Sequence, residues 1–185
     1  MAKATIHNRV VPEPKIMIDG LACLQSINSK VIVMITAAMI PKQERLTFYP
    51  SMTKQFRFLK RTIHRFSELY LKGYYRKGGR YWQFLTLSNG GRFAYPVMNA
   101  PVTFYDPNND TWYAFSQEAA GICIWLVTLR TCAMVAFERD HFVEMDNFSH
   151  YHSRLMEYAN EHVEWDNIAH FITSILHVAE RNEDF

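Results

Sequence analysis

The feature that most constrains the fold is a long apolar segment near the middle of the chain. It runs from Ala119 to Phe137, 19 residues that contain one charged side chain, Arg130. A helix that is apolar on every face either crosses a membrane or lies at the centre of a folded domain. Arg130 lies centrally, where inserting an arginine into a bilayer costs about 2.5–3.5 kcal/mol, so we expect the buried helix.

Amphipathic helices are predicted on both sides of this segment, which Ser116 is expected to cap with Glu118 in the first turn. The earlier helix runs from Thr53, as N-cap, to Leu71. Two later helices are expected to pack on the apolar segment, because apolar residues recur in them every three or four positions. The later stripes are Met145, Phe148, His152, Leu155 and Ala159, then Trp165, Ile168, Ile172, Ile175 and Ala179.

Short strands are expected in the rest of the chain. The β-branched run Val31–Ile35 and the piece Leu46–Tyr49 read as extended, and Pro41 and Pro50 end them. Asn89-Gly90 predicts a type I′ hairpin turn. The predicted central strands are Arg80–Leu87, Arg92–Met98, Val102–Tyr105 and Thr111–Phe115.

This order of elements predicts an α+β fold. An antiparallel β-meander with its hairpin packs against about four α-helices, and the C-terminal half is mainly helical. The 185 residues suit one domain, which we place at residues 31–185. Residues 1–30, with Pro12 and Pro14, read as a loosely held N-terminal arm.

The cysteines and the N-terminal residues predict a cytoplasmic protein. Cys23, Cys123 and Cys132 form no CxxC pair, and we expect three buried small hydrophobic residues. The first residues carry charges and prolines and no apolar run typical of a secretory signal.

Charge is distributed unevenly although the net charge is only +2. Up to Arg92 there are 16 basic and 4 acidic residues, and from Phe93 onward there are 4 basic and 14 acidic residues. The two halves either neutralise each other on packing or leave a basic face for a partner. The candidate binding stripe on the Thr53–Leu71 helix is Lys54, Arg57, Arg61 and Arg65, and Lys72, Arg76, Lys77 and Arg80 follow it.

Catalytic and metal-binding patterns are weak. Asp166 and His170 have i, i+4 spacing suited to a metal, but two ligands do not make a site. Ser88 is a turn residue more readily than a nucleophile, because nothing in the sequence supplies its base. We therefore predict no enzyme, no cofactor and no metal, and keep a metal-dependent hydrolase as an alternative.

Two sequence motifs, in the order in which they occur along the chain, resemble those of the ArdB/KlcA antirestriction family. The stretch from Trp82 to Phe93, with Thr-Leu-Ser-Asn-Gly-Gly inside it and Pro96 beyond, is similar to the signature hairpin of that family. Ser116-Gln117-Glu118-Ala119-Ala120-Gly121-Ile122 looks like its second signature. Arg45 to Pro50 and the pattern Tyr151, Leu155, Tyr158 and His162 match more loosely.

The resemblance implies a small bacterial protein, usually carried by plasmids or other mobile DNA. It implies relief of DNA cleavage by type I restriction–modification enzymes, without a cofactor. The implied partner is the restriction enzyme or a host factor controlling it, and not a membrane. DNA mimicry needs dense carboxylates, which a chain of net charge +2 lacks, so we expect protein contact.

The candidate contact surfaces are the basic stripe and the hairpin tip. The tip consists of Ser88, Asn89, Gly90 and Gly91, which a tight turn would expose. Direct nucleic-acid binding through the basic helix, in the region Lys54–Arg80, stays open as an alternative function.

Overall fold

The computed structural model describes residues 34–71, 82–98, 101–106 and 110–181, with side chains up to residue 175. The predictions for the N-terminal arm, Cys23 and the basic residues at 72–80 lie outside the described residues. In chain order the elements are β1 (Ala37–Met39), a 3-10 turn η1 (Lys42–Glu44), α2 (Phe56–Leu71), β2 (Trp82–Leu87), β3 (Arg92–Pro96), β4 (Val102–Asp106), β5 (Thr111–Phe115), α3 (Gln117–Glu138), α4 (Phe142–Asn160) and α5 (Trp165–Arg181).

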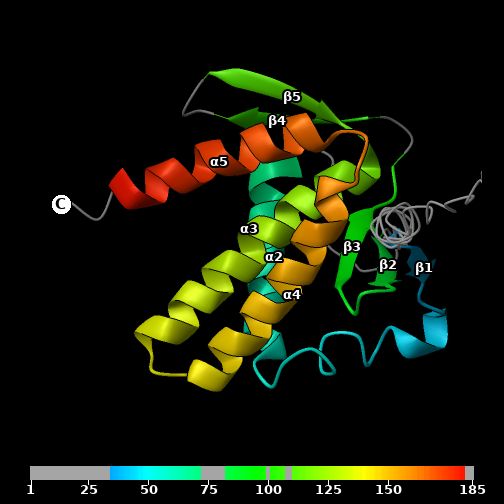
Figure 1. Cartoon of the computed structure of the whole chain (residues 1–185), viewed down its shortest axis with the longest axis vertical. Coiled ribbons are helices and arrows are strands. Elements are labelled where there is room, and N and C mark those ends of the chain that lie inside the picture. The colour runs from blue at the N-terminus through cyan, green and yellow to red at the C-terminus, as the bar shows by residue number, and fades with distance from the viewer. Residues whose placement is uncertain (1–33, 72–81, 99–100, 107–109, 182–185) are drawn as a thin grey trace, which may run out of the picture. The chain divides into compact units, whose positions relative to one another are not determined.

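Helix α3 is the apolar segment, and the other elements pack around it (Figure 1). The Ser116 hydroxyl caps it by accepting a hydrogen bond of 3.2 Å from the Ala119 N–H. Helices α2, α4 and α5 and strands β3 and β5 all contact α3. Although α3 has the length and apolarity of a membrane span, most of it is buried inside the fold, which confirms the predicted central helix.

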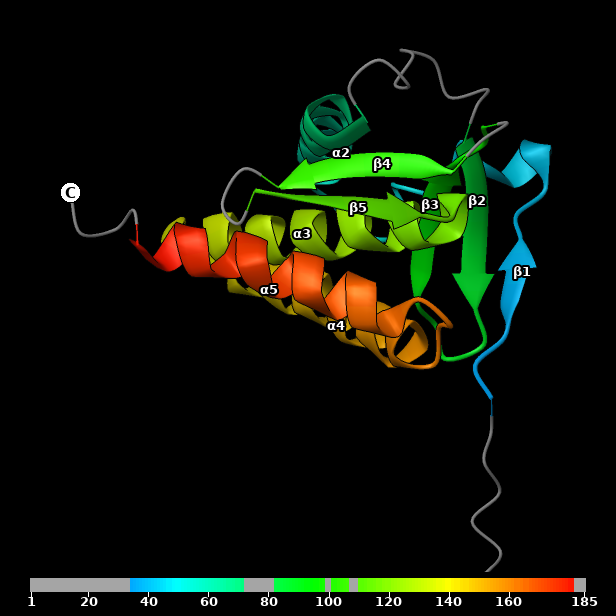
Figure 2. The same ribbon diagram turned by 90° about the horizontal axis from the view of Figure 1, so that it is seen from above.

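The α+β class and the mainly helical C-terminal half are confirmed, and the strands divide into two antiparallel sheets. The first sheet has the order β1-β2-β3, and the second is the hairpin β4-β5, in which Phe104 lies opposite Tyr113. In Figure 2 the three-stranded sheet lies at one end of α3, and the β4-β5 hairpin lies between α2 and α5. Pro96 ends β3 and Pro101 precedes β4, and a proline donates no hydrogen bond to a β-ladder.

The predicted extended piece Leu46–Tyr49 is wrong. Hydrogen bonds from the Thr47 N–H to the Glu44 carbonyl (3.2 Å) and from the Phe48 N–H to the Arg45 carbonyl (3.3 Å) form consecutive turns. These turns bring the Phe48 ring into the core, where 1% of the residue is exposed.

The first described strand also differs from its prediction. Of the run Val31–Ile35, the structure describes Met34 and Ile35, and neither belongs to a strand. The strand β1 follows at Ala37–Met39, where it pairs with β2. Its end before Pro41 agrees with the predicted stop.

Helix α2 begins at Phe56, three residues after the predicted N-cap. Thr53 instead forms a turn before the helix: its hydroxyl oxygen accepts from the Gln55 N–H at 3.0 Å and donates to the buried carboxylate of Glu144 in α4. The apolar stripe is confirmed, since Leu59 and Ile63 are buried against the core. Thr53 therefore ties the start of α2 to the first turn of α4.

Two aromatic clusters fill the core, and the described cysteines lie buried beside them. Cys123 and Cys132 are free, and burial raises the pKa of both thiols, that of Cys132 to about 12. The prediction of buried small hydrophobic residues is confirmed for these two cysteines. One cluster contains Phe48, Tyr49, Phe84 and Trp125, and the other contains Tyr70, Phe104, Tyr113, Phe115 and Phe171.

Candidate functional site

The predicted basic stripe lies on the solvent side of α2 and of the turn before it. We call Lys54, Arg57, Lys60, Arg61 and Arg65 the basic face, and all five residues are exposed. Within the described part of the chain, none of them forms an ion pair. The acidic residues whose side chains the structure describes therefore do not neutralise this face by direct pairing.

The hairpin tip Ser88–Gly91 is built differently from the prediction. The Gly90 N–H donates to the Leu87 carbonyl at 2.9 Å, and the Leu87 N–H donates to the Gly91 carbonyl at 2.8 Å. These bonds enclose a three-residue loop in which Gly90 has φ +89° and Asn89 does not have a positive φ. A type I′ turn needs two positive φ angles, so that prediction is wrong; the loop matches a type I turn followed by a glycine bulge.

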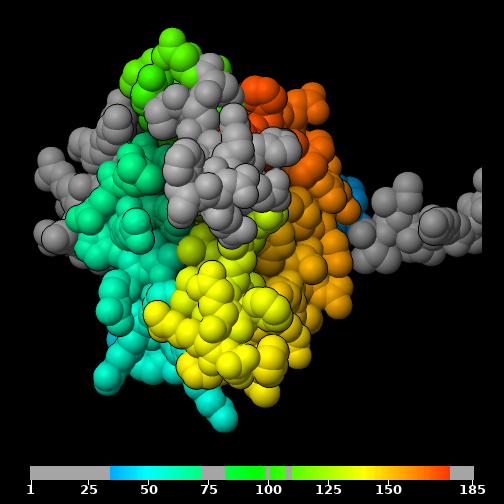
Figure 3. Space-filling view, turned by 90° about the vertical axis from the view of Figure 1, so that its left-hand side faces the viewer, coloured from blue at the N-terminus to red at the C-terminus, as the bar shows by residue number. Residues whose placement is uncertain are grey.

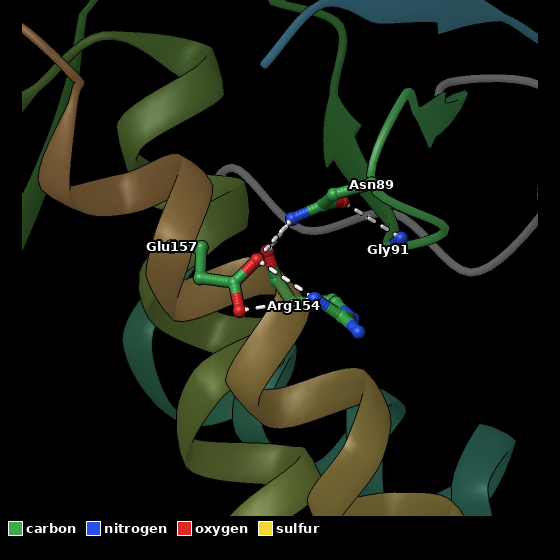
Figure 4. A network of polar contacts seen from close by, with 4 residues as sticks. All are labelled: Asn89, Gly91, Arg154 and Glu157. Atoms are coloured by element: carbon green, nitrogen blue, oxygen red, sulfur yellow. Dashed lines mark hydrogen bonds and ion pairs between the residues drawn. The ribbon is translucent and has the colours of Figure 1, made fainter. Parts of the chain in front are cut away.

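The side chain of Asn89 fastens the tip to helix α4 (Figure 4). Its Nδ2 donates to the Arg154 carbonyl at 2.8 Å and to Glu157 Oε2 at 2.9 Å, while its Oδ1 accepts from the Gly91 N–H at 3.0 Å. A Cβ added to Gly91 would lie 2.8 Å from Leu87 Cδ1 and 3.1 Å from Arg154 Cβ. Asn89 and Gly91 thus hold the hairpin against α4, and turn geometry and packing account for both.

We expect Asn89→Ala to raise the pKa of Glu157. In the intact protein the hydrogen bond from Asn89, and then those from Arg154, hold the pKa of that carboxyl below its ordinary value. A lowered pKa means that the carboxylate stabilises the fold above its unfolded pKa of about 4.3, and that this contribution is lost as pH falls through the folded pKa. Carbon-detected NMR titration of Glu157 measures the change.

The matched control for this titration is Ser88→Ala, which alters the same loop without touching Glu157. If Asn89→Ala leaves the Glu157 pKa where it is, the contact between the tip and α4 is wrong.

Ser88 connects the tip to the first strand. Its N–H donates to the Thr36 carbonyl at 2.9 Å, and its Oγ accepts from the Thr36 N–H at 3.0 Å. Among the described residues, Thr36 is the hydrogen-bond partner of Ser88, and no base activates the hydroxyl. The geometry supports the turn interpretation of Ser88.

The second signature, at the start of α3, is also a packing joint. Tyr158 of α4 donates its hydroxyl hydrogen to Glu118 Oε1 at 2.5 Å. Burial, and then this hydrogen bond, raise the pKa of Tyr158. Gly121 faces strand β3 so closely that a Cβ there would lie 2.4 Å from Tyr95 Cβ and 2.9 Å from the Ala94 carbonyl oxygen.

The turn before α2 and the hairpin tip contact α4 at different points. The start of α2 contacts the first turn of α4 through Thr53 and Glu144, whereas the hairpin tip contacts α4 at Arg154. Ten helical residues separate these points, about 15 Å along the axis.

The candidate metal ligands are not assembled into a cluster. His170 shares a hydrogen bond with the Tyr113 hydroxyl through its Nδ1. In the described ranges no group of three His, Cys, Asp or Glu side chains is placed to hold a metal ion. His152 of the α4 stripe is half-buried, and burial, then the charge of Arg130, lower its pKa. This environment fits the predicted position of His152 on the apolar stripe of that helix.

Comparison with known proteins adds three findings. Residues 74–173 match a family described as antirestriction protein. The uncharacterized protein YafX of Escherichia coli (strain K12) is 31% identical over 156 residues, which cover 77% of this chain and 88% of YafX. A solved structure from work on the KlcA and ArdB proteins matches 75% of this chain and 94% of its own, with a TM-score of 0.57 and 23% identity. Those proteins are described as having a novel fold and antirestriction activity against type I DNA restriction systems in vivo but not in vitro.

Proposed function

Because the chain belongs to the antirestriction protein family, we propose that it relieves the cleavage of incoming DNA by type I restriction–modification enzymes in the bacterial cytoplasm. The family match contains both sequence signatures, and the fold is similar to that of the KlcA and ArdB proteins. These findings support the resemblance to the ArdB/KlcA family on which the proposal rests.

The observation that carries the mechanism is the charge of the surface. A protein that imitates DNA must present carboxylates at the density of phosphates along a duplex. This chain has a net charge of +2, and its exposed basic face carries five cations without ion pairs among the described residues. We therefore propose that it acts by contact with a protein, through the basic face, and not by mimicry.

The description of the KlcA and ArdB proteins narrows the range of candidate partners for this chain. Their activity is present in vivo and absent in vitro. If this chain behaves alike, its partner includes a cellular component that a purified restriction reaction lacks. A host factor that controls the type I enzyme meets this requirement, and so does the enzyme in a state found only in cells.

The direct test is the plating of unmodified phage on cells that carry a type I system and express this chain. We expect plating of the unmodified phage to rise clearly over that on cells with an empty vector, because fewer incoming genomes would be cleaved. Phage already modified by the host is the control, because its plating is independent of restriction. Equal plating of unmodified phage with and without the chain would refute the proposal.

A further inference from the structure

The turn between α3 and α4 exposes a group of large apolar side chains. Phe137 is 61% exposed, Phe142 51%, Val143 71% and Met134 38%. The rings of Phe137 and Phe142 meet edge to face, with centroids 6.3 Å apart. We call these four residues the apolar knob. Exposed aromatic residues gathered at one place are typical of interaction sites.

The backbone holds the knob in a defined shape. The His141 N–H donates to the Ala136 carbonyl at 2.9 Å, and the Asp140 N–H donates to the Phe137 carbonyl at 3.0 Å. With Asp140 at φ +58°, these bonds form the Schellman ending of a helix. Helix α4 begins directly afterwards at Phe142, so the turn fixes both rings beside each other.

The knob borders the basic face. The Arg139 guanidinium lies 5.9 Å from the centre of the Phe58 ring in α2, and Gln55 Nε2 and His141 Nδ1 are 2.8 Å apart. Thr53 adds its hydrogen bond to Glu144. Figure 3 shows the result: the surface of α2, in teal, and the α3–α4 turn, in yellow, lie next to each other on one face of the molecule.

We propose that the apolar knob and the basic face form one docking surface for an acidic protein segment that carries large apolar side chains. The inference rests on the proposed function and names its partner class. The apolar side chains of the acidic segment would cover the rings of Phe137 and Phe142. Its carboxylates would pair with Arg57 and Arg61, which have no ion pair among the described residues. Buried aromatic anchors surrounded by charged contacts are the usual composition of a protein–protein interface.

The charges around the knob favour a protein over nucleic acid. Three exposed acidic residues are close to the rings in the sequence: Glu138 ends α3 directly after Phe137, Asp140 lies in the turn, and Asp146 lies one helical turn after Phe142 in α4. Single-stranded nucleic acid stacks on aromatic rings only where cations track its phosphates, and these carboxylates repel phosphates. Every nucleotide brings a phosphate with its base, whereas a protein segment can place uncharged apolar side chains at the rings and its carboxylates at the basic face.

The first arm of the test uses the plating assay in cells. Phe137→Ser with Phe142→Ser is expected to reduce restriction relief by about tenfold or more, since aromatic anchors at an interface centre dominate binding. The matched control is Leu46→Ser with Val163→Ser, which removes two apolar residues that are 87% and 97% exposed and lie in other segments, the turns after η1 and the connection between α4 and α5. The control is expected to keep full relief, and circular dichroism verifies that both variants fold.

The second arm of the test identifies the chemical class of the partner by crosslinking. A photo-crosslinking phenylalanine analogue replaces Phe142 in cells that carry the type I system, and the crosslinked peptide is sequenced. We expect a peptide rich in Asp and Glu, and we expect Arg57→Glu with Arg61→Glu to abolish the crosslink. Lys42→Glu, an exposed charge reversal away from the knob, is expected to leave it unchanged.

Three results would overturn the docking surface. One is full relief by the Phe137→Ser, Phe142→Ser variant. Another is a crosslink that survives the Arg57→Glu, Arg61→Glu reversal. The third is a crosslink to nucleic acid, or binding to a labelled oligonucleotide that falls steeply with salt and is lost with the two rings. If the unsubstituted chain gives no relief, the proposed function fails, while the crosslink still decides the surface.

Discussion

Replacing Phe48 with alanine is expected to lower the free energy of unfolding by about 3–5 kcal/mol, the usual cost of deleting a large buried ring. Phe48 is 1% exposed, and its ring centroid lies 4.9 Å from that of Phe84 and 5.6 Å from that of Trp125. Both contacts are edge to face, and each adds about 0.5–1.5 kcal/mol to the burial of the ring. The loss should be large because the Phe48 ring is enclosed by other core rings, so its removal leaves a cavity between Phe84 and Trp125.

Urea denaturation followed by tryptophan fluorescence measures this loss, since Trp125 is in contact with the deleted ring. Leu46→Ala is the matched control: it removes an apolar side chain two positions away that is 87% exposed, and it should change stability by less than about 0.5 kcal/mol. A cost below about 1 kcal/mol for Phe48→Ala would show that Phe48 does not belong to the core.

Phe48 also shows why part of the fold could not be predicted from the sequence. The run Leu46–Tyr49 alternates in a way that favours a strand, but short apolar runs carry little information about backbone conformation. Its conformation is decided by Phe84 and Trp125, which are distant in the sequence. The same holds for Thr53, which lies three residues before α2 and donates its hydroxyl hydrogen to the buried Glu144, a residue distant in the sequence.

The helices were predictable because each carries its own pattern. Helix α2 buries one side, so its apolar residues, including Leu59 and Ile63, form a stripe. Helix α3 is mostly buried, so it is apolar on all sides. The structure confirms both patterns. The division of the strands into two sheets was not predictable, because hairpin turn signals fix only neighbouring pairs. Which sheet a hairpin joins depends on the helix that it packs against.

The candidate surfaces were predictable to different degrees. The basic face could be read from the spacing of Arg57, Arg61 and Arg65, because charged residues at helical spacing opposite an apolar stripe must face solvent. The apolar knob was missed, since Phe137 and Phe142 look like core residues in any hydrophobicity pattern. The signal that could have found them is the polar turn Glu138–His141, which ends one helix before the next begins.

The two signatures that reveal the family contain residues with packing roles, and contact between the hairpin tip and a partner stays a prediction. Asn89 and Gly91 fasten a hairpin to α4, and Ser116 and Gly121 start α3 and seat it on β3. Residues of this kind hold the fold together, whereas a partner meets exposed side chains such as those of the basic face. Variants of the knob and the basic face should therefore change antirestriction with little effect on stability, and variants of the signatures should do the reverse.

Among variants of the signature residues, Gly121→Ala has the clearest expected effect on stability. An alanine in the middle of a helix normally stabilises it by about 1 kcal/mol relative to glycine. Here we expect the opposite sign, a loss of about 1–3 kcal/mol or more, because the added Cβ would lie 2.4 Å from Tyr95 Cβ and 2.8 Å from Tyr95 Cα. Those atoms belong to strand β3 and cannot rotate away, so α3 and the sheet must separate.

Urea denaturation measures the change in the free energy of unfolding, and Ser149→Ala is the control. Ser149 is exposed on α4, so alanine there adds helix propensity without meeting a strand and should stabilise slightly. The two substitutions both place alanine inside a helix and differ in what faces the new methyl group. If Gly121→Ala proves as stable as the parent or more so, α3 does not approach β3 at this position, and the role of the second signature as a packing joint is refuted.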